Sequence, residues 1–307
     1  MFCGISVMAQ NSATLKLNLE KNKVYRLRST TEQTVSQTIN GNQQNTETKV
    51  NYTVSLKMID ATPDFIVTEV HFDTLNTSTN TMGKTISINS TQEGNMKSSE
   101  LGDIMSCIMN RLSKTAVYVK IDYTGKPLDV LNQKMLADMI LRDTGSVTLT
   151  GIMRTTVKGQ MVNSLSDETL KTIVEMFTYR LPGKQVSTGE TWNILQQKNS
   201  GGMLLNIKSS FHLDEINGSA AKISAESNIA APENATPMQA NGATITYDNL
   251  KGLSKANFVV DINTGLVVQE KAKTHISGNL GISAPGFSMQ MPMDINGESN
   301  VTGLEIK

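Results

Sequence analysis

Three observations predict a mainly β fold for this sequence. Long runs of residues alternate between apolar and polar, turns containing Asn and Gly separate these runs, and few segments have the spacing of a helix. Thr, Ser and Asn are abundant whereas aromatic residues make up 5%, which suits strands with one apolar and one solvated face. The predicted architecture is a large antiparallel curved sheet or open barrel with about three peripheral helices.

The strands are predicted from alternating runs at residues 50–58, 203–213 and 287–295. In each run, apolar side chains fall on one face of the strand and polar side chains on the other. Ile-Asn-Gly turns at residues 39–41 and 216–218 favour tight hairpins between consecutive strands. We therefore expect an antiparallel meander.

Three segments have helical spacing. The first covers residues 101–112, with Ser98 or Ser99 as its cap, and the second is expected within residues 128–142. The third begins after Ser166, where two acidic residues in the first turn favour the positive end of the helix dipole.

Two similar passages favour an internal duplication. Residues 112–125 read LSKTAVYVKIDYTG and residues 253–265 read LSKANFVVDINTG. Each predicts a strand that enters a tight turn, with Gly125 or Gly265 at a positive φ within the turn. Because β meanders also reuse such hairpins by chance, duplication and coincidence both stay open.

The chain is accordingly divided into three parts. Residues 1–9 are a signal-peptide remnant, residues 10–160 a first β-rich half and residues 161–307 a second one, with one continuous domain as the alternative to two halves. The remnant is predicted because Val7 and Ala9 have the spacing of a signal-peptidase site. A short apolar strand is the other interpretation of this segment. The remnant implies an exported protein, periplasmic or associated with the cell envelope.

Mature protein from the native host is therefore expected to begin at Gln10 or within a residue or two of it. Amino-terminal sequencing checks this directly. Cytosolic protein that retains Met1 would contradict export.

Composition narrows the classes of partner. Lys plus Arg and Asp plus Glu both number 28, so the formal net charge is zero and gives no reason to expect nucleic acid. No run approaches the ~20 apolar residues of a transmembrane helix. Cys107 is the one cysteine outside the remnant, so no intramolecular disulfide is expected in the mature chain. The oligomeric state stays open.

The search for chemistry predicts no catalytic, cofactor-binding or metal-binding residue. His71, His212 and His275 lie far apart and are interpreted as solvated strand residues. The Asp-Ile-Asn-Thr-Gly passage that starts at Asp261 resembles the start of a calcium loop but lacks its later ligands, so a hairpin turn is preferred. Trp192 is assigned to core packing. Cys107 is assigned to a buried apolar position.

Three methionines on one strand face leave an alternative open. Met289, Met291 and Met293 could together hold Cu(I), since thioethers are soft ligands. The same face continues through Phe287 and Ile295, and a buried strand face therefore explains it better. Pro292, which has no N–H to donate, predicts an edge or a bulge here.

Several passages make the chain similar to a known family. The segment TLKTIVEMFTYRLPGKQVSTGETWNI, together with VKIDYTGKPLDV and VVDINTGLVVQ, resembles an uncharacterised exported β-rich family, a domain of unknown function typical of Bacteroidota-type bacteria. The resemblance covers most of residues 15–307. It implies an envelope location and a β-rich fold, and it carries over no catalytic residue.

The expected function is a non-catalytic binding module for an apolar ligand or an envelope partner. One-sided strands without recognisable catalytic groups motivate this expectation. A structural or assembly protein that acts through strand edges is the alternative. An enzyme whose site is assembled from scattered residues is the third interpretation.

Overall fold

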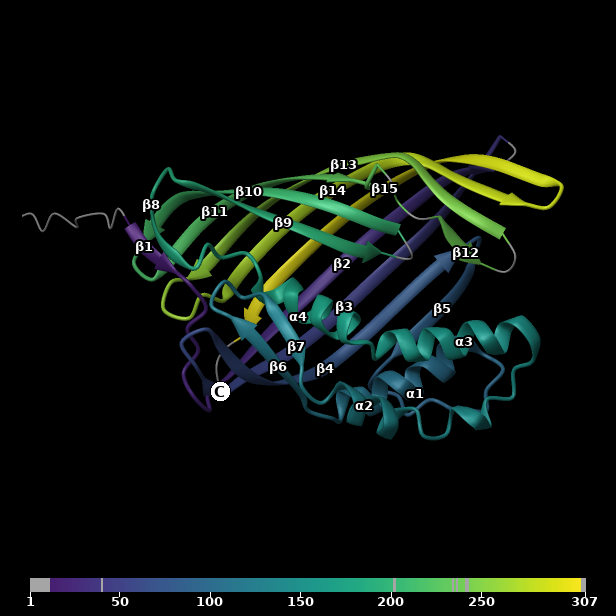
Figure 1. The fold of residues 1–307 in the computed structure, drawn as a ribbon, viewed down its shortest axis with the longest axis horizontal. Helices are drawn as coiled ribbons and strands as arrows, with labels where there is room; N and C mark the ends of the chain where they lie inside the picture. Colours follow the sequence, from purple (N-terminus) through teal and green to yellow (C-terminus); the bar gives the residue numbers. More distant parts are fainter. Residues whose placement is uncertain are drawn as a thin grey trace, which may run out of the picture.

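The computed structural model describes residues 12–39, 41–200, 203–233, 235, 237–240 and 243–304, so the predicted signal remnant at 1–9 lies outside the described residues. Figure 1 shows one long curved sheet with helices gathered beside β4 and β5. The strands of the first part are β1 (Ser12–Leu15), β2 (Val24–Ile39), β3 (Asn42–Ala61), β4 (Phe65–Thr81), β5 (Lys84–Asn89), β6 (Val117–Asp122) and β7 (Pro127–Val130). The later strands are β8 (Lys184–Ser187), β9 (Thr191–Ser200), β10 (Met203–Asn217), β11 (Ala220–Ala230), β12 (Met238–Ala240), β13 (Ala243–Asp261), β14 (Val267–Ala284) and β15 (Phe287–Leu304).

Within the described ranges, the main sheet is antiparallel and has 13 strands. Eleven of them follow the order β7-β6-β4-β3-β2-β15-β14-β13-β11-β10-β9, while β5 pairs with β4 and β12 with β13. The strands β7 and β9 form the two ends of this order, so the sheet is open. The predicted large antiparallel curved sheet is therefore confirmed.

The same order of strands occurs twice. Read from the β9 end of the sheet, the strands are β9-β10-β11-β13-β14, then β15, then β2-β3-β4-β6-β7. Each group of five strands therefore follows the order of the chain in the same direction. The short strands β1 and β8, which precede β2 and β9, pair with each other. The division at residue 160 falls within a helix and stays a prediction.

Four α-helices are present in the described residues where about three were expected: α1 (Leu101–Ser113), α2 (Gln133–Ile140), α3 (Gly151–Ser164) and α4 (Asp167–Thr178), with a short 3-10 helix at Thr144–Ser146. The sequence prediction missed α3 because this helix buries only Val157 and Met161 and so lacks an apolar stripe.

The predicted ends of the helices need two corrections. The second helix is shorter than 128–142, because the strand β7 takes up the first residues of that segment. The N-cap of α1 is Glu100 rather than Ser98 or Ser99. The predicted cap of α4 is confirmed, since the Ser166 side chain accepts a hydrogen bond from the Thr169 backbone N–H.

The two predicted turns have the same construction. Gly125 and Gly265 have φ values of +87° and +73°, as expected from the sequence. Each donates its N–H to the carbonyl oxygen of the aspartate that ends the strand, Asp122 or Asp261, at 2.9 and 2.7 Å. Each aspartate side chain also accepts from the threonine hydroxyl that precedes the glycine. The paired-hairpin prediction is therefore confirmed as local structure.

The apolar core lies between the helices and one face of the sheet, here called the inner face. Leu170, Val174 and Phe177 of α4 belong to the same buried cluster as Leu213, Phe258 and Val301 of the sheet. A second, smaller cluster lies farther along the inner face. The space between the two clusters contains the candidate site.

Candidate binding site

The inner face is organised in rows that run across the strands. Because side chains alternate along a strand, residues in register on the same face form such a row. The first row, within the main core, is Leu213, Ile223, Phe258, Glu270, Val301, Ser29 and Tyr52. Farther along comes a polar row, here called the hydroxyl row: Ser209, Ser227, Ser254, Thr274, Gly297, Gln33, Thr48 and Thr79.

The hydroxyl row is internally hydrogen-bonded. Ser209 and Ser227 bond through their hydroxyls at 2.7 Å, and Thr274 donates to Ser254 at 2.8 Å. These bonds satisfy polar groups that are half-buried, or fully buried in the case of Ser209.

An apolar row, here called the isoleucine row, follows the hydroxyl row. Its members in register are Ile207, Ile229, Gly252, Ile276, Ile295 and Val35. Ile276 and Ile295 are buried, as are Leu205 and Met293 of the same second cluster, whereas Ile207 and Val35 are half-buried.

A hollow of about 170 Å³ lies where the two rows meet. Its walls come from β2, β10, β14 and β15. The lining residues are Thr31, Gln33, Leu205, Thr274, Ile276, Ile295, Gly297, Glu298 and Ser299. One side of the hollow is therefore apolar and the other carries hydroxyl and amide groups. Glu298 also borders the hollow, although the strand register places its side chain on the opposite face of the sheet.

Charged side chains are sorted between the two faces. The hydroxyl row and the isoleucine row contain no charged residue. On the outer face, a row of charges crosses the same strands: Glu226, Lys255, Lys273, Glu298, Glu32 and Lys49. Three ion pairs connect them, including Lys49–Glu32 at 3.0 Å and Lys273–Glu298 at 2.7 Å. The outer face thus favours contact with water, whereas the inner face in this region favours contact with uncharged groups.

Charged side chains occur on the inner face where it borders α4. Arg180 forms an ion pair with Glu270 at 2.9 Å, and both side chains are only 10% exposed. On β9, Lys198 lies 3.7 Å from Glu175 of α4. Burial lowers the pKa of the Lys198 ammonium, and the nearby Glu175 carboxylate partly offsets this effect.

Sequence reasoning missed these four residues. A signal for Lys198 was present, because it continues the inward-facing series of Trp192, Ile194 and Gln196 on β9. A charged residue at such a position is a candidate for function.

The histidines lie on the outer face, as their interpretation as solvated residues requires. Their side chains are 38%, 45% and 58% exposed. Each is close to a carboxylate: His71 to Glu69 at 3.0 Å, His212 to Asp214 at 2.6 Å and His275 to Asp294 at 2.6 Å. Ser224 donates its hydroxyl to Asp214 rather than to His212. Ser224 and His212 therefore do not form a nucleophile–base pair.

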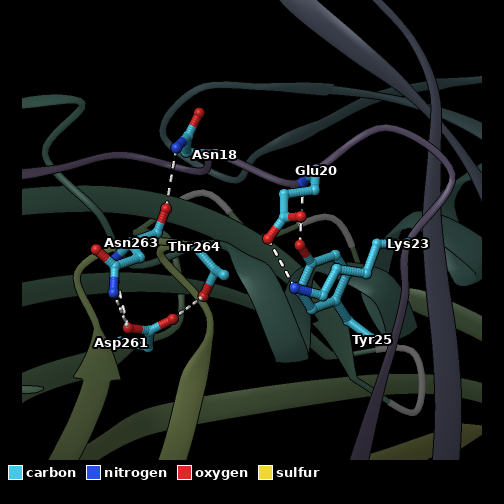
Figure 2. A network of polar contacts seen from close by, with 7 residues as sticks. All are labelled: Asn18, Glu20, Lys23, Tyr25, Asp261, Asn263 and Thr264. Atoms are coloured by element: carbon cyan, nitrogen blue, oxygen red, sulfur yellow. Dashed lines mark hydrogen bonds and ion pairs between the residues drawn. The ribbon is translucent and has the colours of Figure 1, made fainter. Parts of the chain in front are cut away.

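The Asp261 passage is a hairpin turn, as preferred from the sequence. Figure 2 shows Asn263 and Thr264 directed toward Asp261, and the Thr264 hydroxyl donates to it at 2.8 Å. Asn18 donates its side-chain amide to the Asn263 carbonyl at 2.9 Å and so ties the first segment of the chain to this turn. Glu20 forms a 2.7 Å ion pair with Lys23 beside it. In the part of the chain that is described, no three His, Cys, Asp or Glu residues are grouped to hold a metal ion.

The methionine strand follows the buried-face interpretation. Met291, Met293 and Ile295 are buried, as this interpretation requires. The prediction is wrong for Phe287, the first residue of the strand, which is 52% exposed. Although β15 is a central strand, its pairing with β2 begins at Met293, so Pro292 is paired only through β14. The prediction of an edge is therefore correct at Pro292, which has a partner strand on one side, and wrong for the strand as a whole.

Trp192 and Cys107 are buried, as expected. The Trp192 ring stacks on Phe211 with centroids 5.4 Å apart, and its indole N–H donates to the Arg180 carbonyl at 3.1 Å. Burial raises the pKa of the Cys107 thiol, which favours its neutral form over the nucleophilic thiolate.

Comparison with known proteins yields one family. A family of unknown function, DUF6263, matches residues 64–267, more than half of the chain. This confirms the expected domain of unknown function, while the Bacteroidota-type origin and the export stay predictions. No curated protein matches. Within the described residues, no helix has both the length and the apolar character needed to cross a membrane.

Three of the solved structures that match this chain illustrate the similarity, all at low sequence identity. A structure titled for lipid–protein interactions in lipovitellin has a TM-score of 0.48 and 9% identity, over 94% of this chain and 26% of that one. An outer membrane channel from Pseudomonas putida F1 has a TM-score of 0.24 and 7% identity, with 94% and 97% covered. OccK11 of Pseudomonas aeruginosa has a TM-score of 0.20 and 7% identity, with 94% and 99% covered. The chain thus spans about a quarter of the length of the lipovitellin chain.

Proposed function

The chain belongs to DUF6263, a family of unknown function, and we propose that it is a non-catalytic binding module whose inner face holds an elongated apolar or amphiphilic ligand. The hollow between the hydroxyl row and the isoleucine row supports this most strongly. Its apolar side offers Leu205, Ile276 and Ile295, and its polar side offers Gln33 and Thr274. A ligand that is apolar along most of its length and carries a hydrogen-bonding group fits both sides.

The size of the hollow sets how such a ligand lies. Enclosed ligand pockets measure about 300–1,000 Å³, and this hollow is smaller, at about 170 Å³. The ligand therefore lies along the inner face, with one part in the hollow and the rest over half-buried side chains such as Ile207 and Val35. Covering apolar surface contributes about 25 cal/mol per Å².

The edge strands favour binding over assembly. The helix α4 engages both ends of the sheet: the Val130 N–H of β7 donates to Asp167 at 2.9 Å, and Glu175 pairs with Lys198 of β9. A helix beside an edge strand hinders addition of a further strand. We further propose that the protein acts after export, in the periplasm or cell envelope, with a hydrophobic small molecule as its partner.

Saturable binding of a fluorescent fatty acid is the expected result for the purified chain. Ile276→Asp places a charge against the hollow and should weaken binding at least tenfold, about 1.4 kcal/mol. Leu253→Asp is the matched control, because Leu253 lies on the outer face of the neighbouring strand and pairs in register with His275. It should bind like the parent.

Melting curves of both variants separate loss of binding from loss of fold. Absence of saturable binding by the parent would refute the proposal. Equal weakening by Ile276→Asp and Leu253→Asp would refute the inner face as its place.

A further inference from the structure

Lys198 lies next to the hollow through strand register. On the inner face, its partner in register on β10 is Leu205, and Leu205 lines the hollow. Side chains paired in this way have Cβ atoms about 4.5–5.5 Å apart. The Lys198 side chain therefore starts beside the apolar wall of the hollow.

The ammonium of Lys198 is weakly paired. In the described structure it forms an ion pair with Glu175, at 3.7 Å, and Glu175 also accepts a hydrogen bond from the Gln196 side chain. The buried pair of Arg180 and Glu270 also acts on this ammonium, and its two opposite charges offset each other. A lysine ammonium has three donors, so Lys198 retains capacity for an anionic oxygen. The side chain is only 27% exposed, which limits how far water satisfies that capacity.

Lys198 also borders a second hollow. This groove, of about 220 Å³, lies between α4 and β9, and its charged lining residues are three lysines, Lys126, Lys171 and Lys198, and two glutamates, Glu168 and Glu175. The apolar hollow and the polar groove thus meet at the pair formed by Leu205 and Lys198. The hollow side of this pair is apolar, and the groove side carries lysines and glutamates.

We infer that the ligand is a single-chain amphiphile with an anionic head, which Lys198 binds while the chain lies over Leu205, Ile276 and Ile295. The inference rests on the proposed function and deepens it. The head is a carboxylate or a phosphate monoester, since either provides oxygens for a charge-assisted hydrogen bond.

Three probes of equal chain length test the inference: palmitate, hexadecyl phosphate and hexadecanol, each displacing a fluorescent fatty acid. The parent should bind at least one anionic probe tenfold or more tighter than the alcohol. Lys198→Met should remove this preference and leave hexadecanol binding unchanged, and Lys198→Arg should restore part of it. Comparison of palmitate with hexadecyl phosphate identifies the head.

Two further variants exclude a purely structural effect. Glu175→Gln removes the competing carboxylate and should tighten anionic probes several-fold, whereas Lys208→Met on the outer face should change nothing. Two results would overturn the head-group inference and leave the proposed function standing. One is an alcohol that binds the parent as tightly as both anions, and the other is a Lys198→Met variant that keeps the preference for an anion. Failure of all three probes to bind the parent would overturn both.

Discussion

Valine in place of Gly125 or Gly265 is expected to destabilise the protein by about 3 kcal/mol or more. Both glycines have positive φ, which a β-branched residue adopts only at a cost. A Cβ atom would also lie 2.1 Å from the Thr178 carbonyl oxygen at Gly125, and 2.3 Å from the Lys16 carbonyl oxygen at Gly265. These neighbours are backbone atoms and cannot rotate away. Urea and thermal unfolding measure the loss.

Gly189→Val is the matched control, because Gly189 has a φ of +90° and a Cβ there would meet no atom within 4 Å. It retains the backbone strain and lacks the collision, so its loss should be clearly smaller. If Gly125→Val and Gly265→Val melt like the parent, or no lower than Gly189→Val, the tight docking of the two turns is wrong.

Glu270→Ala is expected to cost about 3–5 kcal/mol, since it leaves the buried Arg180 charge without its carboxylate. The Arg180 guanidinium lies 2.9 Å from Glu270 and also stands over the Phe258 ring, 5.1 Å from its centroid. Two of its N–H groups donate to the carbonyl oxygens of Phe177 and Met176. The contact with Glu270 is an ion pair only, because Glu270 Oε2 accepts no well-oriented hydrogen bond in the described structure.

The control for this pair is Glu298→Ala, which breaks an ion pair of similar length on the outer face. Lys273 and Glu298 lie 2.7 Å apart, but their side chains are 81% and 64% exposed, so the melting temperature should scarcely change. Replacing both members of the buried pair, by Arg180→Met with Glu270→Leu, should recover much of the loss. A Glu270→Ala variant as stable as Glu298→Ala would contradict the account of the buried pair.

The local features of this fold were predictable from the sequence. Alternation identified the long strands, the turn glycines gave both hairpins, and Trp192 and Cys107 were placed in the core, because each of these signals resides in a few consecutive residues. The helix α3 was not predicted, because it is held by the packing of Val157 and Met161 and has no continuous apolar stripe.

The candidate site could not be predicted in the same way. The hydroxyl row becomes visible only when the register of seven consecutive pairs of strands is known, from Ser209 on β10 to Thr79 on β4. The pairing of Arg180 with Glu270 likewise joins a segment after α4 to β14. Such contacts depend on topology, and no local pattern encodes them.

The central claim is that a ligand lies on the inner face, and photo-crosslinking tests it most directly. Full-length protein is illuminated with a fatty acid that carries a diazirine on its chain, and the labelled peptides are mapped by mass spectrometry. We predict labels on inner-face residues around the hollow, at Leu205, Ile276 or Ile295, that excess unlabelled fatty acid suppresses. Labels confined to outer-face residues or to the exposed side of α2, or labels that excess fatty acid leaves unchanged, would contradict the claim.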